Sequence, residues 1–231
     1  MIASALSPEV ESMKTRLKHI WMAGDYDRFS RYMESGAREF YERLEIIPGC
    51  RLLDVGCGSG QLALMAAKDG LEVTGVDIAS NSVERARERA AEESLRVRFE
   101  EADAEALPFE DASFDVVASL IGAIFAPRPD RVAQELLRVC KSGGTIAMAN
   151  WTPQGFIGQM FKTVSTFIAP SGMLRRSYGA TKPLSVKGSA GDCRSSIWPG
   201  ATIRSVIPFL LRRWWSSSVS TTDQSIGRSL R

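Results

Sequence analysis

Apolar runs and amphipathic segments alternate along most of the chain. Short apolar runs of the kind that form buried parallel strands lie at 52–55, 73–76, 95–99, 114–120 and 145–149. Segments with helical spacing of apolar residues lie between or after them, at 61–70, 80–94, 131–139 and 155–167. Ser80 is expected to cap the second of these segments, and a turn is expected at 141–144. Two more helical patterns, at 8–19 and 25–44, precede the first run. This alternation predicts an α/β fold, with a doubly wound and mostly parallel sheet.

The stretch from Leu52 to Ile78 carries the most informative pattern. The first apolar run is followed by glycines at alternate positions, then by a helix and by a second run that ends in Asp77. Glycine permits positive φ and lets a ligand approach backbone N–H groups at a helix N-terminus. An acid at the tip of the second strand can accept both hydroxyls of a ribose. The pattern indicates a nucleotide site, and a tight turn without a ligand is the plainer alternative.

The spacing of the glycines separates two kinds of nucleotide. A dinucleotide fingerprint, G-x-G-x-x-G, would need a glycine where Gln61 stands. Asp54, two residues before the first glycine, places negative charge where it would repel a phosphate but attract an ammonium or a sulfonium. We therefore predict a cationic nucleoside, and a nicotinamide oxidoreductase is the alternative from another class.

Four stretches in this order resemble the successive motifs of a known family: LLDVGCGSG, VTGVDI, EADAEALPFEDASFDVV and ELLRVCKSGGTIAMANW. They resemble class I S-adenosylmethionine-dependent methyltransferases, most closely the small-molecule branch called type 11 or UbiE-like. The resemblance covers about residues 12–172. It implies a seven-stranded Rossmann-like sheet, S-adenosyl-L-methionine as cofactor, and in-line transfer of its methyl group to a small-molecule acceptor.

The resemblance also implies which residues contact the cofactor. They are the glycine loop, the acids after the second and third strands with their neighbours, one residue at the end of the fourth strand and one lid aromatic: Asp54, Gly56, Cys57, Gly58, Gly60, Asp77, Ile78, Asp103, Ala104, Ser119 and Tyr26. Asp103 is expected to hold the adenine amino group, and the backbone N–H of Ala104 a ring nitrogen. The plainer alternative for Asp103 is a helix cap or a turn acid. The apolar loop from Ser119 to Phe125 is expected to border the reacting methyl group, and no catalytic residue is named.

In the resembling family the amino-terminal segment folds over the cofactor. Trp21 and Tyr26 are therefore candidate lid residues, with ordinary core aromatics as the alternative. We expect a methyltransferase domain at 1–172, made of a helical lid (1–47) and a cofactor-binding core (48–172), followed by a tail at 173–231. His19, the single histidine, is expected to be a surface or packing residue.

Composition limits the remaining classes. The four cysteines have neither zinc-ligand nor disulfide-scaffold spacing, which favours reduced thiols in the cytoplasm and no metal. The absence of an apolar run of 18 residues or more predicts no membrane span, and the first residues show no secretory signal pattern. Glutamates interleave with the arginines at 84–89, which predicts a solvated helix face and no nucleic-acid partner.

The chain changes character after about residue 170. From Ser171 to Arg231 there are ten Lys and Arg against two Asp, a net charge of +8, while residues 1–170 carry −6. Serine is frequent and periodicity is poor. We expect the C-terminal strands of the fold to be missing or disordered, which would leave the fifth strand as an unpaired edge. A basic arm that binds nucleic acid or an acidic membrane is the alternative.

One hypothesis accounts for this change. When the third base of each permitted codon is read with the first two of the next, the tail gives strings such as SPFLWGDE, FRYPF and PVVEFFRQYYGP. These strings resemble the usual C-terminal part of the same methyltransferase branch, at one consistent offset. We therefore hypothesise a one-base deletion near Met173, so that the tail was not selected to pack on this sheet. The competing view of function is an inactive or unstable cofactor-binding remnant.

Overall fold

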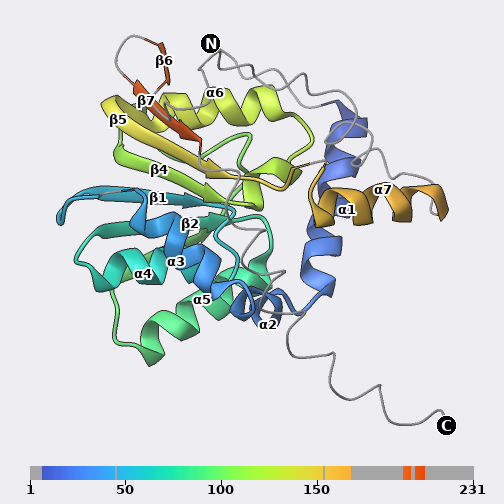
Figure 1. Cartoon of the computed structure of the whole chain (residues 1–231), viewed down its shortest axis with the longest axis horizontal. Coiled ribbons are helices and arrows are strands. Elements are labelled where there is room, and N and C mark those ends of the chain that lie inside the picture. Colours follow the sequence, from blue (N-terminus) through green and yellow to red (C-terminus); the bar gives the residue numbers. More distant parts are fainter. Residues whose placement is uncertain (1–6, 45, 153, 168–194, 199–200, 206–231) are drawn as a thin grey trace, which may run out of the picture.

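The computed structural model (Figure 1) describes residues 7–167, apart from 45 and 153, and two short strands at 195–198 and 201–205. One sheet of seven strands runs through this part of the chain, in the order β3-β2-β1-β4-β5-β7-β6. The strands are β1 (Arg51–Val55), β2 (Glu72–Asp77), β3 (Val97–Glu101), β4 (Phe114–Leu120), β5 (Cys140–Ala149), β6 (Ser195–Trp198) and β7 (Ala201–Ser205). All neighbours pair in parallel except β6 and β7. The predicted α/β, doubly wound and mostly parallel sheet is confirmed.

Helices cover both faces of this sheet (Figure 1). The helices are α1 (Pro8–Ala23), α2 (Tyr26–Arg31), α3 (Glu34–Glu42), α4 (Gln61–Lys68), α5 (Ser80–Glu92), the short 3-10 helix η1 (Gly122–Phe125), α6 (Pro129–Val139) and α7 (Phe156–Phe167). On one face, α4 and α5 pack on Leu52, Val73 and Phe99. On the other face, α6 packs on Leu53, Val117 and Ile146. Buried strands thus carry apolar residues on both sides, as a parallel sheet requires.

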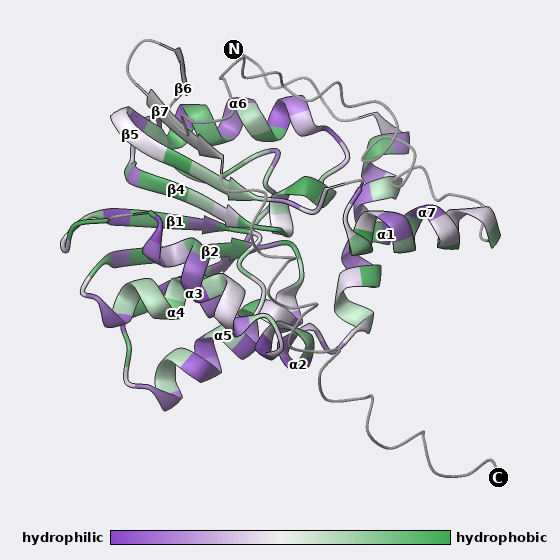
Figure 2. Cartoon of the chain, viewed as in Figure 1, coloured by the Kyte–Doolittle hydropathy of each residue, from purple (hydrophilic) through white to green (hydrophobic). Residues whose placement is uncertain are grey.

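Hydropathy follows this layering (Figure 2). The central strands carry mostly hydrophobic residues, whereas the outer helices alternate hydrophobic and hydrophilic bands. Helix α5 buries one apolar stripe, in which Val83, Ala86 and Ala90 lie at helical spacing against the sheet. Among the helices that the structure describes, none combines the length and the apolar character needed to cross a bilayer.

Four local predictions were wrong in detail. The helical pattern at 25–44 forms two helices, α2 and α3, with a break at Tyr32 and Met33. The dihedral angles of these two residues stay nearly helical, so the spacing of apolar residues does not reveal the break. Ser80 does not cap α5, whose N-cap is Ala79. The third strand runs from Val97 to Glu101 and not over 95–99. It is an edge strand, and its backbone pairs with β2 as far as Glu101 whatever the polarity of its side chains.

The fourth difference concerns the predicted turn at 141–144. It lies within the span of β5, where the pairing with β4 shifts between Phe114 and Val116. Gly143 has a φ of +81° there, which a regular strand residue does not adopt. The turn is therefore a bulge that the strand pairing encloses, and Thr145–Ala149 is the regular part of the strand, as predicted.

The edge of β5 is the main correction. The sequence predicted an unpaired edge, but β7 pairs with β5 from Thr145 to Met148. A free strand edge presents backbone N–H and C=O groups that pair with any segment able to extend, so little sequence information is needed. The rest of the predicted tail, at 173–194, 199–200 and 206–231, lies outside the described residues, and the reading-frame hypothesis remains a prediction.

Candidate functional site

The glycine loop joins β1 to α4 at the carboxyl edge of the sheet. Two of its glycines serve different purposes. A Cβ on Gly56, whose φ is +72°, would stand 2.7 Å from Cα of Gly122, so this glycine allows two loops to touch. Gly58 also has positive φ, +53°, but no atom lies within 4 Å of where its Cβ would be. The backbone at Gly58 is therefore open to a ligand, whereas that at Gly56 is packed.

Asp77 binds this loop from the end of β2. Its carboxylate accepts hydrogen bonds from the backbone N–H of Gly58, at 2.8 Å, and of Ala79, at 2.9 Å. Ile78, between them, is half-buried. Burial raises the pKa of Asp77, and its backbone hydrogen bonds act in the opposite direction. The strand-end acid and the open glycine backbone are therefore held together.

Asp54 lies in β1 just before the loop and is 1% exposed. Burial, and then the charge of Asp77, raise the pKa of Asp54 to about 7, against a backbone hydrogen bond from Ala63 that lowers it. Its Oδ2 is buried without a hydrogen-bond partner among the described residues. A buried acceptor of this kind needs a donor or a cation to offset its desolvation. The position suits a ligand ammonium.

Cys57 has a different environment from its neighbours in the loop. It is 7% exposed and packs in the core formed by α4 and α5. Burial, and then the charges of Asp54 and Asp77, raise the pKa of its thiol, which donates a weak hydrogen bond to the Gly58 carbonyl at 3.6 Å. Its side chain is a packing element. Its backbone N–H donates to the Val76 carbonyl and its carbonyl accepts from the Gly60 N–H, both at 2.9 Å, so the residue holds the loop in shape.

Asp103 and Ala104 follow β3, near the first helix. The Asp103 carboxylate accepts a hydrogen bond from the backbone N–H of Glu105 at 2.9 Å, which is the turn role weighed in the sequence. It also forms an ion pair with Lys14 of α1, whose ammonium lies 2.6 Å from Glu105. Glu105 is 1% exposed and binds Arg128 through both the backbone N–H and the guanidinium, at 2.6 and 2.8 Å. Sequence reasoning missed Lys14, Glu105 and Arg128.

Ser119, at the end of β4, is fully buried. Its hydroxyl donates to the Val55 carbonyl at 2.7 Å and accepts from the Ala123 N–H at 3.1 Å. Both functions of the hydroxyl are thus used to hold β1, β4 and η1 together. In the following loop, Ile121 has a φ of +74°, which is unusual for a β-branched residue. The loop expected to border the methyl group is therefore apolar and strained.

Aromatic rings from four elements meet beside this loop. Trp21 of α1 lies 5.2 Å from Tyr26 and 4.8 Å from Phe125, measured between ring centroids, and Phe125 lies 6.4 Å from Phe161 of α7. Desolvation raises the pKa of Tyr26, so its phenol stays protonated near neutral pH. Of the two candidate lid aromatics, Trp21 therefore contacts the loop that follows the central strand, and Tyr26 packs against Trp21.

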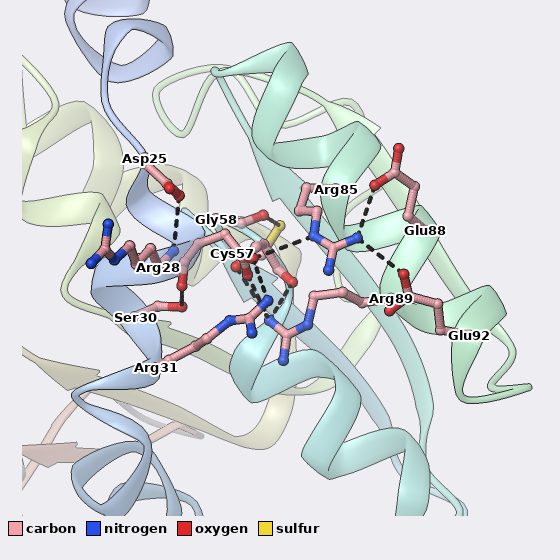
Figure 3. A network of polar contacts seen from close by, with 12 residues as sticks. Asp25, Arg28, Ser30, Arg31, Cys57, Gly58, Arg85, Glu88, Arg89 and Glu92 are labelled. Carbon is pink, nitrogen blue, oxygen red and sulfur yellow. Dashed lines mark hydrogen bonds and ion pairs between the residues drawn. The ribbon is translucent and has the colours of Figure 1, made fainter.

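The charged face of α5 has a role that the sequence did not predict. Figure 3 shows Arg85 and Arg89 reaching from α5 toward the glycine loop at Cys57 and Gly58 and toward α2. Arg87 donates to the Phe99 carbonyl at 2.6 Å. Glu84, Arg87 and Glu88 are exposed, as the predicted solvated face requires. Arg85 and Arg89 are half-buried and also hold other elements, which the sequence did not predict.

A separate groove of about 600 Å³ lies at the opposite edge of the sheet. It is lined by the amino ends of β1–β4, including Arg51, Thr74, Arg98 and Phe114. The residues predicted from the sequence do not line it. Among the described residues no group of three or more His, Cys, Asp and Glu is arranged to hold a metal ion.

Comparison with known proteins gives this arrangement a family. Residues 53–148 match the family described as "Methyltransferase domain". They form a methyltransferase domain. It runs from β1 to β5 and so contains the glycine loop, Asp77, Asp103 and the loop after β4.

Three curated proteins that resemble this chain illustrate the similarity. The uncharacterized protein Rv1405c of Mycobacterium tuberculosis is 39% identical over 160 residues, which are 69% of this chain and 58% of that protein. The methyltransferase GfsG of Streptomyces halstedii is 39% identical, over 57% of this chain and 49% of its own. The 27-O-demethylrifamycin SV methyltransferase of Amycolatopsis mediterranei is 40% identical, over 55% and 50%. This chain therefore spans only about half to three fifths of the curated relatives it matches.

A solved structure resembles part of the domain. The match to a SAM-dependent methyltransferase of Methanosarcina mazei covers 44% of this chain and 52% of that protein, at 32% identity and a TM-score of 0.42. At so low a TM-score the likeness supports no conclusion about this chain.

Proposed function

We propose that the methyltransferase domain binds S-adenosyl-L-methionine and transfers its methyl group by in-line displacement to a small-molecule acceptor. The observation that carries the proposal is the pair of carboxylates on adjacent strands, Asp54 and Asp77, at the loop whose backbone is open at Gly58. Within the part of the chain that the structure describes, Asp54 Oδ2 is buried without a hydrogen-bond partner, and Asp77 holds the loop by accepting from the backbone N–H of Gly58. An ammonium, a ribose and a peptide backbone are the groups that such a set accommodates.

In this proposal each cofactor group has residues to hold it. Asp54 takes the α-ammonium, the peptide groups from Gly56 to Gly60 take the amino-acid part, and Asp77 with Ile78 takes the ribose. Asp103 and the backbone of Ala104 take the adenine, with Lys14 as a neighbour of Asp103. When bound, the cofactor supplies an electrophilic methyl group on a sulfonium.

The acceptor side is supported by what surrounds the end of β4. The segment from Ser119 to Phe125 holds no acid, lysine or histidine, and the aromatic cluster next to it is apolar. Residues of this kind exclude water and align an acceptor, which can lower a barrier by several kcal/mol without a dedicated base. The name of one relative specifies a small molecule, 27-O-demethylrifamycin SV, which supports a small-molecule acceptor here.

The domain limits from the sequence belong to the same proposal. Residues 1–47 act as a lid, residues 48–172 as the cofactor-binding core, and residues 173–231 take no part in the site. Free cysteines at Cys50, Cys57 and Cys140 support a reducing, cytoplasmic location.

Calorimetric titration with S-adenosylhomocysteine tests the binding step. Gly58→Ala adds a methyl group in the open space beside the loop and should weaken binding at least tenfold. Gly70→Ala is the matched control, since Gly70 also has positive φ, +80°, and no atom within 4 Å of a built Cβ. Both changes impose a similar backbone strain, about 1–2 kcal/mol, but only Gly58 belongs to the loop. Equal binding by the two variants would argue against the site.

A cofactor-binding remnant without activity is the second candidate, and the atypical tail at 173–231 favours it. It predicts normal S-adenosylhomocysteine binding with no methyl transfer to any acceptor tested. A nicotinamide oxidoreductase predicts NAD binding instead. Titration with both ligands, followed by activity measurements on the chain with its frame restored, separates the three possibilities.

A further inference from the structure

The short helix α2 presents a carboxylate to the glycine loop. Asp27 has a side chain that is 17% exposed. Its Oδ2 lies 2.9 Å from the guanidinium of Arg31 and 3.3 Å from Nε of Arg85, and its Oδ1 lies 3.5 Å from Nη1 of Arg89. Arg31 belongs to α2 itself, but Arg85 and Arg89 belong to α5. The carboxylate therefore joins the two helices.

Arg89 carries this connection to the loop between β1 and α4. Its Nη1 donates to the carbonyl of Ser59 at 2.9 Å and to the Ser59 hydroxyl at 3.2 Å. Ser59 stands between Gly58 and Gly60 and is 5% exposed. A movement of Arg89 would thus be felt at the open peptide of Gly58.

Asp27 is held as an anion in this position. Burial raises the pKa of Asp27, but hydrogen bonds from Arg31, Ser59 and Arg85 lower it by more. The pKa of Asp27 therefore lies below its ordinary value. The charge that bridges α2, α5 and the loop is therefore present throughout the neutral range.

The partners of Arg85 show why these contacts differ from ordinary surface ion pairs. Arg85 also pairs with Glu88 and Glu92, whose side chains are 63% and 61% exposed and lie on the same helix. Exposed pairs within one helix contribute little. The contact with Asp27 is less exposed and spans 58 positions of the chain. The side-chain amide of Asn81, one turn before Arg85, donates to the Met22 carbonyl at 3.0 Å, so the same face of α5 also holds the end of α1.

We propose that Asp27 is a positioning residue that couples the docking of α2 to the conformation of the glycine loop through Arg85, Arg89 and Ser59. Docking of α2 brings Tyr26 beside Trp21 and fixes the backbone of Gly58 in its cofactor-binding form. The inference rests on the proposed function, because it gives the glycine loop a cofactor to hold. Coupling is reciprocal, so bound cofactor must in turn hold α2 more firmly.

The test compares Asp27→Asn with Asp25→Asn in the full chain. Asp25 carries the same charge two residues earlier, but its carboxylate only caps α2, at 3.0 Å from the Arg28 N–H. Titration with S-adenosylhomocysteine should show a dissociation constant about tenfold higher for Asp27→Asn, within the usual range of coupling between sites. Asp25→Asn should stay within twofold of the wild-type chain, and Asp27→Glu, which keeps the charge, should recover part of the loss.

A double-mutant cycle separates positioning from general damage. Arg89→Met should weaken binding as Asp27→Asn does, and the double variant should be no weaker than the weaker single variant, because one pathway is interrupted twice. Additive losses, or wild-type affinity in Asp27→Asn, would overturn the inference. If Asp27→Asn does not fold, Arg89→Lys decides alone: it keeps the charge but loses the two contacts to Ser59, and unchanged affinity would then overturn it. Failure of the wild-type chain to bind S-adenosylhomocysteine is a different result, since it removes the proposed function itself.

Discussion

The ammonium of Lys14 contacts the carboxylate of Asp103, 89 positions further along the chain. One turn later in α1, Lys18 contacts Glu101 in the same way. Two lysines of one helix thus meet acids at the end of β3, but their environments differ. The Lys14 side chain is 10% exposed and also pairs with the fully buried Glu105, whereas the Lys18 side chain is 32% exposed.

Burial should decide how much each lysine contributes. Removing one partner of a buried ion pair leaves an uncompensated charge, so we expect Lys14→Met to lower the free energy of unfolding by about 3 kcal/mol. Lys18→Met should lower it by less than about 1 kcal/mol, because its pair is exposed to water. Urea denaturation of the two variants measures the difference. Similar losses in both would show that α1 is not anchored through Glu105.

Asp54 should make the stability depend on pH. Its pKa is about 7 in the folded chain and about 4 in the unfolded chain. Between these values the unfolded chain releases a proton that the folded chain retains, so stability falls as pH rises from 4 to 7 and is level above 7. The sign is opposite to that of an acid stabilised by a salt bridge.

Asp54→Asn removes this titration. Asp77 is present in both the variant and the wild-type chain, so its own titration contributes to both pH profiles. We therefore expect the variant to gain about 3–4 kcal/mol relative to the wild-type chain between pH 4 and pH 8. Urea denaturation at pH 4.5, 6 and 8 measures it. Parallel pH profiles for the two chains would mean that Asp54 is ionised in the folded state. Saturating S-adenosylhomocysteine should flatten the wild-type profile, because its ammonium favours the carboxylate.

The parts of the site that the sequence could predict are those that a local pattern encodes. The glycine loop and Asp77 follow one another within about twenty residues, and each glycine or strand-end acid has a local physical reason. Lys14 and Glu105 have none. Their contact depends on how α1 meets the segment at the end of β3, and a lysine in an amphipathic helix looks the same whether it is solvated or buried.

The arginines of α5 show the same limit. Each arginine has a glutamate three or four residues away in the same helix, and this local partner is enough to explain the arginine. The sequence therefore shows no sign of a second partner in another element. Only the packing of α2 on α5 brings Asp27 to Arg85. The edge of β5 differs again, since backbone pairing with β7 uses groups that every residue carries.

At position 121 a glycine variant should be more stable than an alanine variant, which is the reverse of the usual order. With φ at +74° and ψ at −37°, every residue with a Cβ is strained at this position, and glycine is not. In ordinary elements glycine is less stable than alanine by about 0.5–1 kcal/mol. Here we expect Ile121→Gly to be more stable than Ile121→Ala by about 1–2 kcal/mol. Thermal unfolding of both variants measures the order, and a more stable alanine variant would show that the backbone relaxes.

The last prediction concerns the reading frame. If one base is missing near codon 173, the DNA should contain, in the shifted frame, codons for the methyltransferase-like strings found above. A chain with that frame restored should then present strands selected to pack on β5. Those strands would bury apolar area that an unselected tail does not, so the melting temperature should rise by several degrees.

The control for this prediction is a chain that ends at residue 172. If β7 contributes only backbone pairing, this truncation should change the melting temperature less than restoring the frame does. It should nevertheless aggregate more, because the edge of β5 is then free. A shifted frame without a methyltransferase-like continuation, or a truncation as destabilising as a core substitution, would mean that the present tail was selected for this sheet. The ladder from Thr145 to Met148 would then be a native part of the fold.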